Sequence, residues 1–160
     1  MAEEPRDIQL RHLAEEMGIL FQEMGGSAIT GRILGRLLVS VPEQQSLTEL
    51  AEYLGASKGA VSQATRQLVA SGLIVKVPVP GTRSSYFRLR DNAWVQVSRS
   101  KVTYATMMRA LADKAVALLA DEDPAHRHRA EEMAEFYRFM EDAFPRLLEE
   151  WLQSRENPNA

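Results

Sequence analysis

Four polar side chains between residues 58 and 66 recur at the spacing of one face of an α-helix. Lys58, Ser62 and Arg66 follow one another at intervals of four residues, and Gln63 stands beside Ser62. On an α-helix this spacing places them on one side. Glutamine and arginine can form paired hydrogen bonds with adenine and guanine edges, and a helix fits the major groove. The pattern predicts a helix whose outward side reads DNA.

The flanking residues predict the two helices of a helix-turn-helix. Ser46 and Glu49 form a capping box at the start of the first helix, and Gly55 can end that helix in a left-handed conformation. Ser57 can cap the second helix after a turn of only a few residues. The residues expected to face inward on the second helix are Val61, Leu68 and Val69, with Ala64 or Thr65 between them.

A β-hairpin is predicted to follow the second helix. Residues 73–79 are rich in β-branched side chains, a Pro-Gly pair makes a tight turn, and residues 86–90 alternate like a returning strand. The tip is short and polar and contains Arg83, which suits a minor groove or a phosphate. Helix, turn, helix and hairpin are the order of a winged helix-turn-helix. Residues 27–90 are therefore predicted to form a winged domain in a mainly α-helical chain.

Composition excludes several classes of protein. The chain has 160 residues, 45% of them hydrophobic, which is enough for one small domain with appended helices. No apolar run approaches the roughly 20 residues of a membrane span, and the acidic first residues do not resemble a secretory signal. The absence of cysteine excludes disulfides and thiolate metal sites. We expect a cytoplasmic protein that does not bind membranes.

The charge distribution favours DNA as a partner, although the net charge of the chain is −3. Residues 27–90 contain eight basic and three acidic residues, which gives them a net charge of +5. The rest of the chain has a net charge of −8. Because phosphate binding depends on the local field, the positive charge lies where DNA contact is predicted.

Three further helices are predicted to have narrow apolar stripes, at about residues 5–24, 93–120 and 125–152. Such a stripe needs a partner helix, and one chain with a small winged core cannot easily bury three. A two-fold dimer would bury them, so residues 5–24 and 93–152 are predicted to form a dimerisation region, with a monomeric bundle as the alternative. Residues 153–160 are predicted to be a flexible tail. The positions assigned to the dimer interface are Leu10, Leu13, Met17, Leu20, Met108, Leu111, Tyr137, Met140, Phe144, Leu147 and Trp151.

Small and basic residues alternate on the helix predicted for residues 28–39. Gly31 and Gly35 lie four residues apart and are expected to permit close packing of a neighbouring helix, because a glycine inside a helix is otherwise unfavourable. Arg32 and Arg36 share one face of the same helix. They are predicted to lie at the edge of the DNA surface or on a plain solvated face.

No spacing of polar residues indicates an enzyme, a cofactor or a metal site. His126 and His128 follow three acidic residues, but side chains two apart on a helix point about 200° apart. A solvated helix start is therefore favoured over a metal site. Pro145 is expected to kink or split the last helix.

Aromatic and methionine side chains in the long helices suggest a second site. Methionine fills irregular space and suits varied apolar ligands. A dimer core is the simpler interpretation of the same residues. The positions considered for a small-molecule effector pocket are Trp94, Tyr104, Met107 and Met108.

The segments GRILGRLLV, SLTELAEYLGASKGAVSQATRQLVASGLIVKV and PGTRSSYF resemble the GbsR/MarR-like group of winged helix-turn-helix transcriptional regulators. The resemblance implies a homodimer on a palindromic operator, usually a repressor, and often one that is released by a small molecule. It also implies DNA contacts from the second helix and the wing. Gly59 is included because its lack of a side chain lets the helix N-terminus approach a phosphate closely. The expected DNA-binding residues are Ser57, Lys58, Gly59, Ser62, Gln63, Arg66, Thr82, Arg83 and Ser84.

One alternative function stays open at this point. A winged domain can also dock a partner protein without touching DNA. Such a module would have an apolar or acidic outward side on its second helix, whereas Lys58, Gln63 and Arg66 occupy that side here.

Overall fold

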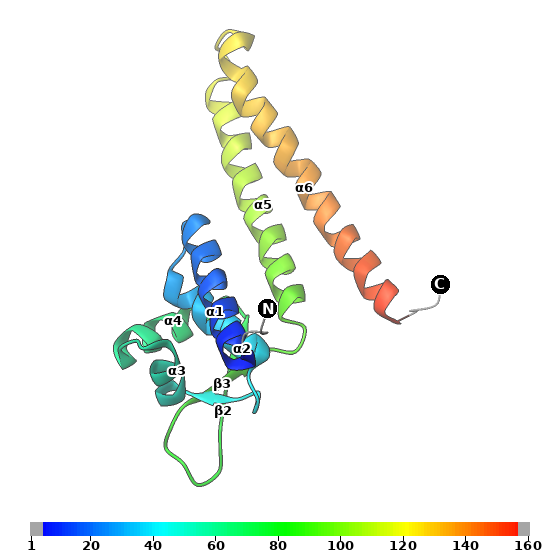
Figure 1. Ribbon diagram of the computed structural model, residues 1–160. Helices are drawn as coiled ribbons and strands as arrows, with labels where there is room; N and C mark the ends of the chain where they lie inside the picture. Colours follow the sequence, from blue (N-terminus) through cyan, green and yellow to red (C-terminus); the bar gives the residue numbers. More distant parts are fainter. Residues whose placement is uncertain (1–4, 157–160) are drawn as a thin grey trace. The chain divides into compact units, whose positions relative to one another are not determined.

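The computed structural model describes residues 5–156, which fold into two compact units. The first unit ends at Ala93 and the second begins at Trp94, so the boundary falls at the start of a long helix (Figure 1). The elements are α1 (Arg6–Glu23), α2 (Ala28–Val39), β1 (Gln45–Ser46), α3 (Leu47–Leu54), α4 (Lys58–Ala70), β2 (Ile74–Val77), β3 (Tyr86–Leu89), α5 (Ala93–Leu118) and α6 (Pro124–Glu156).

Local capping residues set the ends of α3 and α4, as the sequence predicts. The Ser46 hydroxyl accepts from the Glu49 backbone N–H at 3.1 Å, and the Ser46 N–H donates to the Glu49 carboxylate at 2.6 Å. Gly55 ends α3 with φ +58°. The Ser57 hydroxyl accepts from the Ala60 N–H at 3.2 Å and caps α4. These bonds satisfy backbone groups that a helix start leaves without partners.

The core of the first unit lies between α2, α3, α4 and the sheet. Both Ala64 and Thr65 of α4 are buried between Val61 and Leu68, as expected. The expectation for Val69 is wrong, because this side chain is 37% exposed. The largest fully buried side chains are Ile33, Leu34, Leu50, Val61, Thr65, Leu68 and Ile74.

The wing is part of a three-stranded antiparallel sheet with the order β1-β3-β2. In β2 and β3, Ile74 pairs with Leu89 and Lys76 pairs with Phe87. The sequence pattern does not predict β1, whose two residues precede α3 and pair with the beginning of β3. The Leu47 N–H also donates to the Ser85 carbonyl at 3.0 Å. The root of the wing is therefore hydrogen-bonded to the start of the helix-turn-helix.

Helix α1 packs against α2 in the first unit, through small residues. A Cβ on Gly31 would lie 2.3 Å from the Met17 carbonyl oxygen, and a Cβ on Gly35 would lie 2.9 Å from the Ala14 Cα. The buried residues of α1 are Ala14 and Gly18, four apart. The close packing expected of the two α2 glycines is confirmed. Helix α1 lies in the first unit, with the winged elements, and its part in a dimerisation region together with residues 93–152 stays a prediction.

The second unit consists of α5 and α6, joined by a short turn (Figure 1). Its buried side chains are mainly alanines: Ala105, Ala112 and Ala134. Helix α6 is continuous from Pro124 to Glu156, so of the two outcomes expected for Pro145 the split is wrong, and the kink stays a prediction. The helix also extends into the predicted tail as far as Glu156, and the rest of that tail lies outside the described residues.

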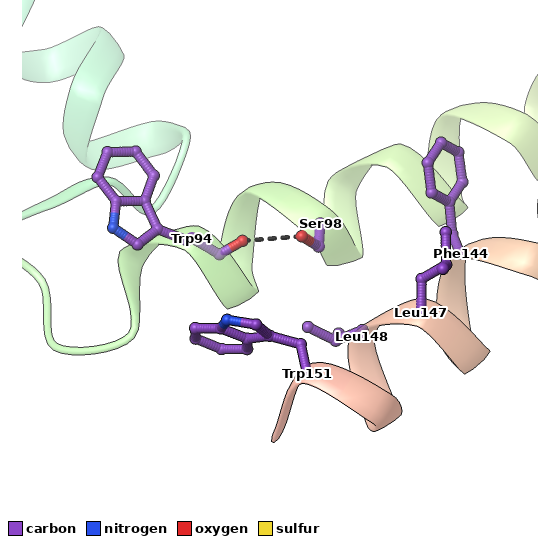
Figure 2. Close-up of a pocket in the computed structure, with 6 residues that line it drawn as sticks. All are labelled: Trp94, Ser98, Phe144, Leu147, Leu148 and Trp151. Atoms are coloured by element: carbon purple, nitrogen blue, oxygen red, sulfur yellow. Dashed lines mark hydrogen bonds between the residues drawn. The ribbon is translucent and has the colours of Figure 1, made fainter. Parts of the chain in front are cut away.

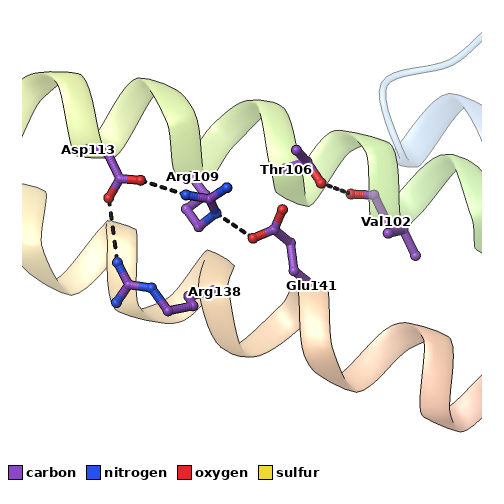
Figure 3. Close-up of polar contacts among 6 residues, drawn as sticks. All are labelled: Val102, Thr106, Arg109, Asp113, Arg138 and Glu141. Carbon is purple, nitrogen blue, oxygen red and sulfur yellow. Dashed lines mark hydrogen bonds and ion pairs between the residues drawn. The ribbon is translucent and has the colours of Figure 1, made fainter.

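Ion pairs connect α5 to α6 across the second unit (Figure 3). Arg109 bonds the Glu141 carboxylate on α6 and also donates to Asp113 on its own helix, at 2.7 Å. Arg138 of α6 lies 3.5 Å from Asp113. The Thr106 hydroxyl and then Arg109 lower the pKa of Glu141. Long polar side chains therefore add to the packing of the small alanines between the two helices.

Candidate nucleic-acid interface

The outward side of α4 presents the predicted reading residues to solvent. Lys58, Gln63 and Arg66 are exposed, and Ser62 is half-buried between them. The Arg66 guanidinium donates to the Ser62 hydroxyl at 3.2 Å, one helical turn away. Within residues 5–156, no acidic side chain forms an ion pair with Lys58 or Arg66. Both cations are therefore available to an external anion.

The first turn of α4 is open at its surface. Ser57 and Gly59 are exposed, and the nearest atom to a Cβ built on Gly59 is the Ser57 hydroxyl at 4.0 Å. The Ser57 oxygen accepts the Ala60 N–H, so its own O–H can still donate. Free N–H groups at a helix start favour an anion such as phosphate.

The wing tip is exposed from Gly81 to Ser84. Gly81 has φ +79°, a conformation that favours glycine, and this turns the chain after Pro80. The Thr82 hydroxyl accepts from the Ser84 N–H at 2.9 Å, which shapes the tip locally. Arg83 projects from this short turn with no ion-pair partner in the described part of the chain.

Arg32 and Arg36 have structural partners, so the expectation of a plain solvated face is wrong, and their position at the edge of the DNA surface stays a prediction. Arg32 of α2 pairs with Glu15 of α1. The Arg36 guanidinium lies 4.1 Å from the Tyr53 ring centroid and donates to the Gln45 side chain at 3.1 Å. These bonds hold α2 against α1, α3 and β1.

The residues proposed for dimerisation remain accessible within each unit. On α1, the stripe positions Leu13 and Leu20 are exposed, because the buried side of this helix is formed by smaller residues. The other exposed members are Leu111, Leu147 and Trp151, and the half-buried members are Leu10, Met17, Met108, Tyr137, Met140 and Phe144. Large apolar side chains at these positions are available to a partner surface.

An apolar pocket of about 350 Å³ opens between the beginning of α5 and the end of α6 (Figure 2). Trp94 and Ser98 line it from α5, and Trp151 lines it from α6. The Ser98 hydroxyl donates to the Trp94 carbonyl at 2.9 Å. The remaining lining residues are Phe144, Leu147 and Leu148. A pocket of this size and character can hold a small apolar ligand.

Of the four positions considered for an effector, the structure places only Trp94 on this pocket. Tyr104 lies further along α5 and packs edge-on against Tyr137 of α6, with ring centroids 6.0 Å apart. Its hydroxyl raises the pKa of Tyr137. Met107 is 62% exposed and Met108 is half-buried, and neither lines the pocket.

Sequence reasoning missed the α6 side of this pocket, although a signal was present. Trp94 and Trp151 lie at similar distances before and after the turn that joins the two long helices. Antiparallel helices joined by a short turn bring such positions together. Folding the predicted helices back on each other would therefore have placed the two tryptophans at one end of the pair.

The part of the chain that the structure describes contains no group of three residues able to hold a metal ion. His126 Nδ1 lies 4.0 Å from the Glu122 carboxylate, one turn away at the start of α6. Among the described helices, none has the length and apolar character needed to cross a membrane.

Two family models match the chain, one in each unit. The MarR family model covers residues 27–83. The model of MmpR5-like MarR family transcriptional regulators covers residues 92–155. The first match contains the capped helix pair and the second contains both long helices, so the matches follow the division seen in the structure.

Known proteins that resemble this chain over most of its length are also transcriptional regulators. The HTH-type transcriptional regulator MmpR5 of Mycobacterium tuberculosis is 35% identical over 144 residues, which are 90% of this chain and 87% of that protein. The HTH-type transcriptional repressor OpcR of Bacillus subtilis is 27% identical over 114 residues, 64% of this chain and 61% of that protein. The crystal structure of a transcriptional regulator, 35% identical, matches with a TM-score of 0.82 over 91% of this chain and 99% of the other.

These relatives are transcriptional regulators and not enzymes. The predicted winged helix-turn-helix fold and the predicted DNA-binding regulatory function are both confirmed. The chain belongs to the MarR family of winged-helix transcriptional regulators.

Proposed function

We propose that this regulator is a homodimeric repressor that places its two α4 helices in successive major grooves of a palindromic operator. The observation that carries the proposal is the exposed polar side of α4, where Gln63 has the chemistry to read base edges and Arg66 offers a cation to the DNA. Lys58 and the wing residue Arg83 would contact phosphates beside them. A dimer with two-fold symmetry reads two half-sites about 34 Å apart, or one helical turn of DNA.

The dimer is proposed from exposed apolar surface. Leu20 of α1 is 49% exposed, Met24 directly after α1 is 76% exposed, and Leu111 of α5 is 59% exposed. Large exposed apolar side chains commonly mark protein interfaces, and each unit has such side chains on a helix. The named relative OpcR is a repressor, which favours the same sign of regulation here. The likeness to GbsR-like members, carried by residues 31–39, 46–77 and 80–87, and the cytoplasmic location stay predictions.

Selecting binding sites from a pool of random duplexes tests DNA reading directly. We expect a palindrome whose half-sites are separated by about one turn of DNA. Gln63→Ala should then relax the preference at one base pair in each half-site, because the amide no longer pairs with a base edge. An equal loss of affinity on selected and random duplexes would contradict base reading by Gln63.

Sedimentation analysis tests the dimer separately from DNA binding. The wild-type chain should sediment as a dimer, and Leu20→Glu or Leu111→Glu should shift it towards the monomer, because each variant places a charge in the proposed interface. Glu16→Gln, on the exposed surface of α1, is a control that should leave the dimer intact. A wild-type chain that stays monomeric at the concentrations used for DNA binding would overturn the dimer.

We also propose that the pocket between α5 and α6 binds a small apolar effector that releases DNA. The two tryptophans of the chain, Trp94 and Trp151, both line this pocket. Tryptophan fluorescence therefore reports occupancy without a label. Lipophilic aromatic probes and small amines can be titrated with and without operator DNA. An effector must change the fluorescence and weaken DNA binding, since ligand and DNA would favour different states.

The sequence leaves open one alternative, a protein-docking module that does not bind DNA, and membership of a family of transcriptional regulators argues against it. The exposed polar side of α4 argues against it, because such a module would present an apolar or acidic surface there. The two candidates differ in retention on a random duplex. A DNA-binding domain is retained at low salt and released by roughly 200 mM, as bound counterions are recovered by the DNA.

A further inference from the structure

A groove of about 410 Å³ lies between the outward side of α4 and the wing. Ser62 and Arg66 border it from the helix, and Lys76 and Ser85 border it from the wing. Its apolar floor includes Val69 and Phe87. The groove belongs entirely to the first unit, so its lining is set by one fold.

The strand register explains why Lys76 faces this groove. Lys76 of β2 is directly opposite Phe87 of β3, and residues paired in this way share one face of a sheet. Phe87 is buried, so this face is the one covered by the helices. Lys76 itself is exposed, which places its ammonium at the open edge of the same face. A cation from the wing thus borders the groove opposite Arg66 of α4.

The positive charge of the groove is not balanced by acidic side chains in the described part of the chain. Neither Arg66 nor Lys76 belongs to an ion pair in the structure of residues 5–156, and no acidic side chain lines the groove. Two serine hydroxyls, of Ser62 and Ser85, lie on the same borders. Cations and hydroxyls together are the side chains that most often bind phosphate oxygens of DNA.

The apolar floor also suits a nucleic-acid strand. Val69 is 37% exposed at the groove, although its position in the sequence suggests a core residue. A deoxyribose presents C–H groups beside each phosphate, and a partly exposed valine offers them an apolar surface. A strand lying in the groove could therefore place its sugars on the floor and its phosphates between the two cations.

We propose that this groove holds the sugar–phosphate backbone of the DNA strand that runs between the major groove entered by α4 and the minor groove at the wing tip. Lys76 and Arg66 bind a phosphate from opposite sides. This assigns a DNA contact to Lys76 and makes Arg66 a backbone contact in place of a base reader. The proposal rests on α4 and the wing forming the DNA surface.

Salt dependence of duplex binding tests the proposal, because each phosphate contact contributes about 0.9 to the slope of log K against log salt. Lys76→Gln should reduce the slope by about 0.9 for each bound subunit, and Lys76→Arg should restore it. Lys114→Gln, which removes an exposed lysine from α5, is the matched control and should leave the slope unchanged. Val69→Ser should lower affinity at every salt concentration without changing the slope.

The second measurement compares how strongly the Arg66→Gln variant binds the selected duplex and a random duplex. Arg66→Gln should weaken the selected and the random duplex equally, since a backbone contact carries no sequence information. Relaxed preference at one base pair after Arg66→Gln would overturn its assignment to the backbone. An unchanged slope after Lys76→Gln would overturn the groove as a phosphate site.

Arg83→Ala shows whether a negative result concerns the groove alone or the whole proposed DNA surface of α4 and the wing. If Arg83→Ala reduces the slope but Lys76→Gln does not, the wing tip contacts DNA and the groove proposal is wrong. If neither variant changes the slope, α4 and the wing do not form the DNA surface, and both proposals fall. Each variant should unfold at the same temperature as the wild type, because the substituted side chains are exposed. A change in DNA binding then does not come from a change in the fold.

Discussion

Gly31 of α2 lies directly against the backbone of Met17 in α1, so that an added Cβ would come within 2.3 Å of the Met17 carbonyl oxygen. The obstructing atom is backbone and cannot rotate away. Replacing glycine with alanine inside a helix normally gains up to about 1 kcal/mol. Overpacking costs about 1–3 kcal/mol, and here it requires α1 to move away from α2.

We therefore predict that Gly31→Ala lowers the free energy of unfolding in urea. Gly59→Ala is the matched control in α4, where the nearest atom to the built Cβ is 4.0 Å away. That variant should be as stable as the wild type or slightly more stable. A stabilised Gly31→Ala protein would contradict the tight contact between α1 and α2.

Two guanidiniums lie over the Tyr53 ring of α3. Arg11 of α1 lies 4.4 Å and Arg36 of α2 lies 4.1 Å from the ring centroid, and Arg11 also donates to the Tyr53 carbonyl at 2.8 Å. Each cation–π contact at an exposed site contributes about 0.5–1 kcal/mol. Tyr53→Leu should therefore lower the free energy of unfolding by about 1–2 kcal/mol.

Tyr53→Phe provides the control for the ring itself. The Tyr53 hydroxyl is buried without a hydrogen-bond partner in the described structure, so phenylalanine retains both cation contacts and removes an unsatisfied group. Its unfolding free energy should equal or exceed that of the wild type. Equal losses in the phenylalanine and leucine variants would show that the cation contacts do not stabilise α3.

The capping box of α3 makes stability depend on pH. The backbone N–H and then the hydroxyl of Ser46 lower the pKa of Glu49 below its ordinary value of 4.5. A carboxyl with a lowered pKa stabilises the fold above its ordinary pKa, and this contribution is lost as pH falls through the folded value. The difference in unfolding free energy between wild type and Glu49→Gln should therefore shrink on acidification below about pH 4.5.

Ser46→Ala tests the other half of the same box. Loss of an N-cap serine costs about 1 kcal/mol. This cost should persist at neutral pH, where the Glu49 carboxylate is charged. A stability difference between wild type and Glu49→Gln that grows on acidification would contradict the stabilising role of the charged Glu49.

The pKa of Glu141 reports the contacts between α5 and α6. The Thr106 hydroxyl lowers this pKa most, followed by Arg109, whose own pKa is raised chiefly by its bond to Glu141. Thr106→Val and Arg109→Gln should each raise the pKa of Glu141, measured from the NMR shift of its side-chain carbonyl carbon. Lys114→Gln, on the exposed side of α5, should not. A pKa of Glu141 that neither Thr106→Val nor Arg109→Gln raises would show that these contacts are not made in solution.

Short-range chemistry explains why the helix-turn-helix could be predicted. Ser46, Glu49, Gly55 and Ser57 act on backbone groups within four residues of themselves, so the sequence contains both partners of each interaction. The glycines of α2 were also informative, because a glycine in a helix interior usually indicates a close neighbour.

Features that depend on distant partners were not predicted. Strand β1 has only two residues, and it exists because the beginning of β3, about forty residues later, pairs with it. Arg36 looks solvent-facing in the sequence, yet Tyr53 and Gln45 contact it in the folded unit. Val69 continues the apolar side of α4, but the groove beside the wing leaves it partly exposed. No local pattern specifies such partners.

The hydrogen bonds between β1 and β3 fix the wing at its root, while residues 81–84 at the tip hang beyond the sheet. Replacing or lengthening the tip would therefore leave the capped helix pair undisturbed. Natural or engineered diversification of target preference can concentrate in this loop, since a new tip can be grafted there without re-optimising the scaffold. The same anchorage makes the loop a suitable place to insert a probe or a reactive handle.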